Sequence, residues 1–176
     1  MTTMQGPQAL TDAWVETAVE YSAGKAFAGD RQKTRQALRQ GRCDVCEYLR
    51  YSLAGQIGDY LGVTDPMVKA VYLVEAEEPD GFDDVAPIRQ PTGINLIAWV
   101  ERKTAAVAAL AKSLEAGLAA SRRALGCDRA ASACFFLDVH LVDDADVQER
   151  RGYGVLVNSL HVEPMKVWGR VGLPLS

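Results

Sequence analysis

Two acidic side chains and one lysine have the types and the spacing of a divalent-metal site. Asp80 follows Pro79 in an acidic segment, and Glu101 and Lys103 stand two positions apart directly after the apolar run 94–100. Two carboxylates can hold a divalent cation, while a lysine beside them can position or activate the attacking water. Residues of these types are therefore candidates for metal-assisted hydrolysis.

This set of residues is similar to the motif of metal-dependent nucleases of the PD-(D/E)xK type. The resemblance covers Pro79, Asp80, Glu101 and Lys103 and does not extend to the rest of the chain. It implies a divalent-metal-dependent nuclease or phosphodiesterase in which Asp80, Glu101 and Lys103 are the catalytic residues. It also implies that the glutamate and the lysine lie between a strand and a helix, as they do in the pattern of this sequence.

The two carboxylates must approach each other if they are to share a metal ion. If the expected strands 67–77 and 94–100 pair as an antiparallel hairpin, Asp80 and Glu101 lie at opposite ends, about 20–25 Å apart at about 3.3 Å per residue. A shared ion then requires the acidic loop 78–92 to run back along the sheet. The alternative is that Glu101 lies in a solvated first helical turn, where the helix dipole favours a negative charge.

A Cys-x-x-Cys sequence at the start of the third expected helix predicts a second kind of site. A thiol in the first turn of a helix can have a lowered pKa and become reactive, so Cys43 and Cys46 are candidates for redox chemistry. Together with Cys127 and Cys134 they are also candidates for a zinc site. Further ligands available in principle are His140 and His161. Buried, unreactive thiols are the alternative to both interpretations.

Asp138 and His140 form a third candidate site because they are two residues apart in an expected strand and therefore share a face. A carboxylate beside an imidazole can fix its tautomer and support general-base chemistry. The sequence identifies no nucleophile for such chemistry. A half-exposed strand face or a buried, hydrogen-bonded histidine is the alternative.

The second expected helix is basic and is a candidate for binding phosphate or an acidic partner. It begins at Asp30, whose carboxylate can accept hydrogen bonds from the first free backbone N–H groups. Its basic side chains have no acidic neighbour along the sequence before Asp44; they are Arg31, Lys33, Arg35, Arg39 and Arg42. The acidic segment 75–84 carries the opposite charge, so one copy of the chain could dock against another. A solvated helix face is the alternative.

Apolar periodicity predicts an α+β fold in which these candidates are arranged. Steps of three and four residues predict three N-terminal helices within about 9–62, the third ending at Gly62, and a central helix ending at Gly126. The expected strands of a ββαββ block within about 67–163 are 67–77, 94–100, 133–142 and 155–162. We expect a mixed or antiparallel sheet of about four strands with helices packed on it, and an irregular tail, 164–176. No glycine-rich turn follows the first strand, which disfavours a dinucleotide-binding doubly wound fold.

Length and charge limit the class of protein. A chain of 176 residues is long enough for one domain, 1–176, and short for two. Its 23 acidic and 19 basic residues give a net charge of −4, which disfavours nucleic acid as the main partner. The sequence has no signal-peptide pattern and no apolar run of about twenty residues for a membrane span. Without export signals, the cysteines are expected to be reduced thiols in a cytoplasmic protein.

These patterns favour a small acidic protein that binds a protein partner or assembles with itself, without catalysis of its own and without a cofactor. The segregated charges and an apolar tail that contains Trp168 support this hypothesis. A PD-(D/E)xK nuclease with Mg²⁺ or Mn²⁺ is the first alternative. A zinc-stabilised or redox Cys-x-x-Cys module is the second.

Overall fold

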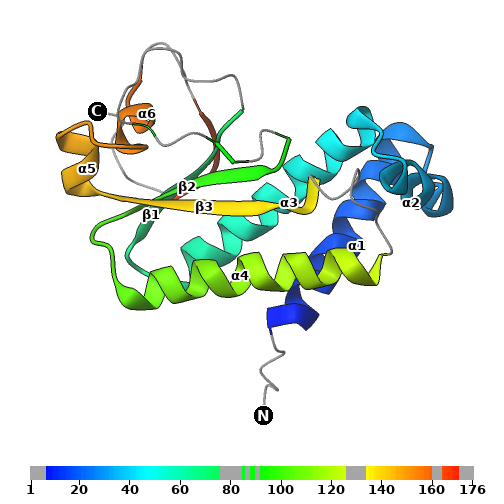
Figure 1. The fold of residues 1–176 in the computed structure, drawn as a ribbon, viewed down its shortest axis with the longest axis horizontal. Helices are drawn as coiled ribbons and strands as arrows, with labels where there is room; N and C mark the ends of the chain where they lie inside the picture. The colour runs from blue at the N-terminus through cyan, green and yellow to red at the C-terminus, as the bar shows by residue number, and fades with distance from the viewer. Residues whose placement is uncertain are drawn as a thin grey trace. The chain divides into compact units, whose positions relative to one another are not determined.

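The computed structural model of the chain describes residues 7–75, 85, 88–89, 92–125, 134–159 and 164–170. In this part of the chain the helices are α1 (Pro7–Ala26), α2 (Arg31–Arg39), α3 (Cys43–Thr64), α4 (Ala105–Ala124), α5 (Asp144–Gln148) and α6 (Gly154–Val157). The strands are β1 (Val68–Leu73), β2 (Ile94–Val100), β3 (Leu137–Asp143) and β4 (Met165–Gly169) (Figure 1). The predicted α+β class, with N-terminal helices ahead of the strands, is confirmed.

The strands form one mixed sheet in the order β3-β2-β1-β4. β1 pairs antiparallel with β2, and Leu73 lies opposite Leu96. β4 pairs antiparallel with the other edge of β1. Ile94 begins β2, and Phe136 directly precedes β3. The Ile94 N–H donates to the Phe136 carbonyl at 2.7 Å. Pairing start to start makes these two strands parallel, and the helical crossover between them allows that arrangement.

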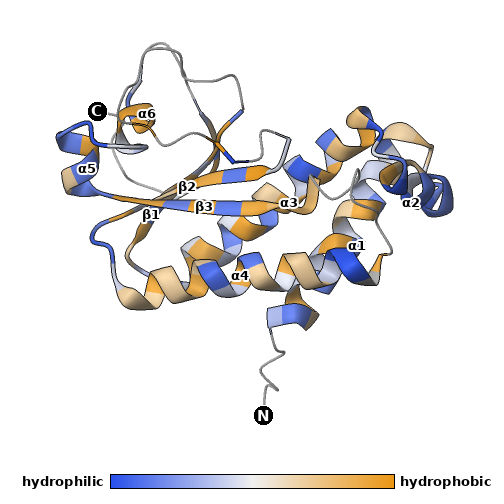
Figure 2. Cartoon of the chain, in the orientation of Figure 1, coloured by the Kyte–Doolittle hydropathy of each residue, from blue (hydrophilic) through white to orange (hydrophobic). Residues whose placement is uncertain are grey.

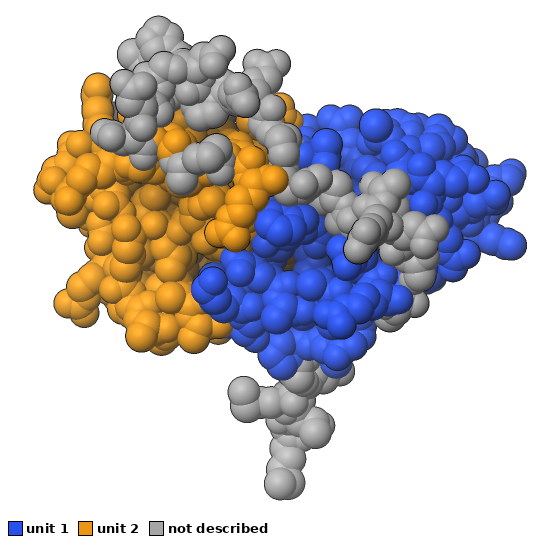
Figure 3. Space-filling model, in the orientation of Figure 1, with its two compact units in different colours: residues 1–53, 92–94, 110–137 blue, residues 54–91, 95–109, 138–176 orange. Residues whose placement is uncertain are grey.

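The chain folds into two compact units, each built from segments that are distant in the sequence (Figure 3). Unit 1 comprises residues 1–53, 92–94 and 110–137, and unit 2 comprises residues 54–91, 95–109 and 138–176. Unit 1 contains α1 and α2, and unit 2 contains most of the sheet. The single domain expected for residues 1–176 stays a prediction.

Within unit 2, both faces of the sheet are covered. On one face, Val71 of β1 and Val167 of β4 lie against Gly58 in the C-terminal half of α3. On the other face, apolar residues of the strands form a cluster with residues from α5, α6 and the turn before α6. This cluster, called here the outer-face cluster, comprises Ala70, Tyr72, Val74, Ile97, Val142, Val147, Tyr153 and Leu156. Because both faces of the sheet are covered, β1 has large apolar side chains on both of its sides.

The C-terminal part of the chain differs from the sequence prediction. The strand expected at 155–162 is wrong over its first residues, which form the short helix α6, while 160–162 lie outside the described residues. Gly154, the first residue of α6, lies so close to the backbone of Asp146 that an added Cβ would overlap it. The last strand is β4, inside the tail expected to be irregular. An edge strand pairs on one side only and tolerates a glycine such as Gly169, which lies opposite Ala70.

Two other boundaries also differ. Between the expected strands 133–142 and 155–162, where the sequence predicts no helix, lies α5. It is capped by Asp143, whose side chain accepts from the Asp146 N–H while the Asp146 side chain accepts from the Asp143 N–H. The third helix passes Gly62 and ends at Thr64. Gly62 is therefore not a helix stop. Its missing side chain leaves room for the Trp168 ring, which an added Cβ would overlap.

We predict opposite stability effects for alanine at two glycines of α3. Gly62→Ala should lower the free energy of unfolding by about 1–3 kcal/mol, because the methyl group collides with the Trp168 ring. Gly55→Ala is the matched control. A Cβ there meets no atom within 4 Å, so alanine should stabilise the helix by about 0.5–1 kcal/mol. Urea unfolding measures both, and stabilisation by Gly62→Ala would contradict the packing described.

Candidate functional site

β3 carries two polar side chains on the face of the sheet that bears the outer-face cluster. Val142 belongs to the cluster, and side chains alternate along a strand, so His140 and Asp138 lie on the same face. Asp138 is only 8% exposed. The sequence prediction that these two residues share a face is confirmed by β3, and the fold adds that the face is covered.

The Asp138–His140 pair has an unusual hydrogen-bond status. The His140 Nε2 and the Asp138 Oδ2 are 3.8 Å apart, which is too long for a hydrogen bond. Both atoms are buried, and neither has a hydrogen-bond partner among the residues that the structure describes. Tyr153 covers His140, with the ring centroids 3.8 Å apart and the planes at 17°. Buried polar atoms are nearly always paired in proteins, so this pair requires an explanation.

Arg89 is the cation nearest to this carboxylate in the ion pairs seen. Its Nε lies 3.6 Å from the Asp138 Oδ2, and its side chain is 76% exposed, whereas that of Asp138 is 11% exposed. An exposed guanidinium thus lies over a buried carboxylate without a short hydrogen bond to it. Such a contact is weak, because the cation is well solvated and gains little from pairing.

The surroundings determine which of these groups carry charge. Burial lowers the pKa of His140 from its usual value of 6.5, the Asp138 carboxylate acts in the opposite direction, and Arg89 adds a small further decrease. Burial also raises the pKa of Tyr153, and the negative charge of Asp138 adds to that increase. At neutral pH the imidazole and the phenol are therefore both uncharged. Arg89 is then the charged group that lies nearest to Asp138 among the described ion pairs.

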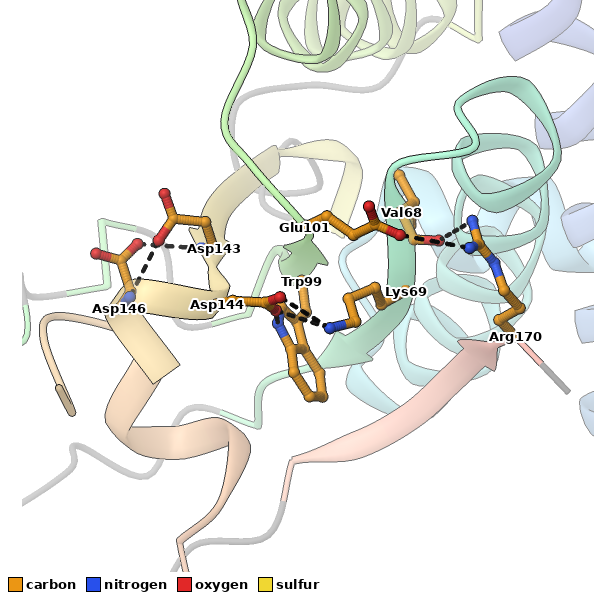
Figure 4. Close-up of polar contacts among 8 residues, drawn as sticks. All are labelled: Val68, Lys69, Trp99, Glu101, Asp143, Asp144, Asp146 and Arg170. Carbon is orange, nitrogen blue, oxygen red and sulfur yellow. Dashed lines mark hydrogen bonds and ion pairs between the residues drawn. The ribbon is translucent and has the colours of Figure 1, made fainter. Parts of the chain in front are cut away.

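A polar network at the other end of the same face holds α5 on the sheet (Figure 4). The Asp144 carboxylate accepts from the Lys69 Nζ at 2.8 Å and from the Trp99 Nε1 at 2.8 Å. The Lys69 Nζ also lies 4.7 Å from the centroid of the Trp99 ring. These contacts join β1, β2 and α5, and every polar atom named in them has a partner. We interpret this network as structural.

The two described residues of the nuclease motif, Glu101 and Lys103, contact different partners. Glu101 lies 3.7 Å from the Nη1 of Arg170, which follows β4 (Figure 4). Lys103 instead forms an ion pair with Asp146 in α5. Burial acts to raise the pKa of Asp146, but hydrogen bonds from Lys103 and from the Asp143 backbone lower it overall. The third residue, Asp80, lies outside the described residues, as do Asp83 and Asp84.

Two of the four predicted zinc ligands come together. The Sγ atoms of Cys46 and Cys134 are 3.0 Å apart, while Cys43 is exposed at the start of α3. Cys127 and His161 lie outside the described residues. No three histidine, cysteine, aspartate or glutamate side chains are grouped as metal ligands in the part of the chain that the structure describes.

The residues of α2 are mostly hydrophilic (Figure 2), and the five basic residues from Arg31 to Arg42 all contact acidic side chains or a carbonyl. Arg35 and Arg31 pair with Glu16 and Glu20, which lie on α1. The other contacts are Lys33 with Asp30, Arg42 with Asp44, and the Arg39 Nε with the Leu125 carbonyl. Asp30 caps the helix as predicted. Because these side chains contact groups of their own unit, they provide little support for docking to a second copy.

The comparisons with known proteins add no relative: the chain matches no family model, no curated protein and no solved structure. Among the described residues, no helix is both long and apolar enough to span a membrane. The functional argument therefore depends on the site alone. Its two residues that sequence reasoning missed are Arg89 and Tyr153, which come from segments outside β3 and carry no motif of their own.

We predict that His140 titrates below the usual histidine pKa. Asp138→Asn should lower this pKa further, and Arg89→Gln should raise it, because the first variant removes a negative charge near the imidazole and the second a positive one. The pKa is measured by following the histidine ring resonances by NMR as a function of pH. A His161→Gln variant identifies which of the two resonances belongs to His161. A His140 pKa at or above about 6.5 would contradict the burial described.

The lowered pKa of His140 also predicts how the free energy of unfolding depends on pH. Since the folded-state pKa of His140 is depressed, the unfolded chain binds the proton more readily, and acid favours unfolding. The contribution to stability is complete above about pH 6.5 and declines as the pH falls through the folded-state pKa. A His140→Gln variant should lose less stability than the wild type over this range in urea unfolding. Equal losses would count against the prediction.

Proposed function

We propose that this chain is a non-catalytic binding protein that recognises an ammonium or guanidinium group at the Asp138–His140 pair. The observation that carries the proposal is the Asp138 Oδ2, a buried carboxylate oxygen without a hydrogen-bond donor among the described residues. A buried acceptor left without a donor costs about 1–3 kcal/mol, and more when it is charged. A ligand that donates a hydrogen bond to this oxygen would recover that free energy.

The charge at the site favours a cation over a neutral or anionic ligand. His140 is uncharged at neutral pH because burial lowers its pKa, so it does not neutralise Asp138. A buried carboxylate attracts a cation more strongly than a carboxylate in water does, because the surrounding medium screens less. An anion would meet the same carboxylate and be repelled.

Arg89 supports the choice of ligand because a guanidinium already lies over this position. Its Nε is 3.6 Å from the Asp138 Oδ2, and the side chain is largely exposed. Displacing it costs little, since exposed ion pairs contribute about 0–1 kcal/mol. A ligand cation that reaches hydrogen-bond distance would replace a long contact with a short one. Arg89 would then act as a weak internal competitor.

The proposal predicts a specific pattern of binding across four proteins. The probes are agmatine and butylamine, with butanol as the neutral control, measured by isothermal titration calorimetry. Asp138→Asn should weaken the binding of both amines by at least about tenfold, because it removes a charge-assisted hydrogen bond. Arg89→Gln should strengthen it, since the competing cation is gone. Asp59→Asn, the same charge change at an exposed position of α3, should bind as the wild type does.

A peptide that carries one lysine or arginine, compared with the free amines, distinguishes a protein partner from a small ligand. Tighter binding of the peptide, still dependent on Asp138, indicates a protein partner. Butanol binding as well as butylamine would contradict recognition of a cation. Equal binding by the wild type and by Asp138→Asn would exclude Asp138 as the recognising group.

A further inference from the structure

We propose that Cys46 and Cys134 form a redox-active dithiol that closes to an intramolecular disulfide by exchange with a small-molecule disulfide. The inference concerns unit 1 and is independent of the cation-binding proposal. It also differs from the pairing suggested by the Cys-x-x-Cys sequence, because the partner of Cys46 comes from the segment before β3.

The distance between the two sulfur atoms carries the inference. The Cys46 and Cys134 Sγ atoms are 3.0 Å apart, although 88 positions separate them in the chain. A disulfide bond is about 2.05 Å long, so the bond needs an approach of only about 1 Å. Both residues belong to the same compact unit. The fold of unit 1 thus holds the two thiols almost at bonding distance.

The exposure of the two thiols assigns them different roles. Cys46 is partly exposed in the first turn of α3, whereas Cys134 is 2% exposed. An external disulfide can therefore reach Cys46 and not Cys134. The contact with Cys134 lowers the pKa of the Cys46 thiol, and this effect outweighs burial and the negative charge of Asp44. Cys46 is the attacking thiol, and Cys134 resolves the mixed disulfide.

The exchange proceeds in two balanced steps with oxidised glutathione as the oxidant. The Cys46 thiolate attacks one sulfur of glutathione disulfide, a mixed disulfide forms, and one glutathione thiolate leaves. The Cys134 thiol then loses its proton and attacks the Cys46 sulfur, which forms the protein disulfide and releases the second glutathione. In total, two protein thiols are oxidised, one glutathione disulfide is reduced, and two glutathione thiols are produced.

The experiment treats the full chain with oxidised glutathione and maps the products by mass spectrometry after trypsin digestion without reduction. Cleavage after Arg42, Arg50, Arg123, Arg129 and Arg150 places the four cysteines in peptides 43–50, 124–129 and 130–150. The wild type should lose the mass of two hydrogen atoms and give peptide 43–50 joined to peptide 130–150. The Cys43→Ser variant is the matched control, and it should give the same joined peptides.

The variant Cys134→Ser should stop at the first step and carry one glutathionyl group on Cys46. Mapping of the wild type and of Cys43→Ser tests the inference even if Cys134→Ser does not fold. Peptide 43–50 joined to peptide 124–129, a bond within peptide 43–50, or an unchanged Cys46 would overturn it. So would glutathione attached to Cys43 alone.

Discussion

The attachment of α5 and α6 to the outer face of the sheet is the interaction on which the candidate site depends. Asp144 anchors α5 by accepting from Lys69 on β1 and Trp99 on β2. Val147 and Leu156 then complete the apolar cluster. Without this cover, the polar residues of β3 would lie on a solvated strand face. With it, Tyr153 stacks on a partly buried His140, next to the buried Asp138.

Burial makes the Asp138–His140 pair energetically unfavourable, because its polar atoms lose water without gaining hydrogen bonds among the described residues. The same cover that excludes water from His140 lowers its pKa, so the imidazole cannot supply the positive charge that would satisfy Asp138. The polar groups around Asp144 show that this sheet can pair a carboxylate with two donors. The different status of Asp138 therefore reflects the site and not a general shortage of donors. An unsatisfied buried polar atom requires an explanation, and the proposed cation ligand supplies one.

The sequence predicted what depends on neighbours along the chain. The apolar periods of α3 and α4 correspond to buried helix faces, the apolar run of β2 is buried along nearly its whole length, and the two-residue spacing placed Asp138 and His140 on one face. Contacts that depend on the tertiary fold could not be predicted in this way. Glu16 and Glu20 pair with α2 from another helix, and Cys46 meets a thiol 88 positions away.

The C-terminal segment shows why local patterns failed there. Alternating apolar residues around Val155 resembled a strand, but the segment forms α6, whose Gly154 packs closely on the backbone of α5. Glycines after Val167 resembled an irregular tail, but an edge strand accommodates them. In both places the packing of neighbouring elements, and not local propensity, determines the backbone. Tyr153 joins the site by stacking on His140, and Arg89 joins it by its contact with Asp138.

The stability of a double variant, Asp138→Leu with His140→Phe, tests most directly whether the pair is kept for binding and not for folding. Both replacements are apolar and suit the outer-face cluster, and replacing buried polar pairs with apolar groups is often neutral or stabilising by about 1–4 kcal/mol. The free energy of unfolding from urea titration should therefore equal or exceed that of the wild type. A double variant less stable by several kcal/mol would show that the pair stabilises the fold, and would contradict this account.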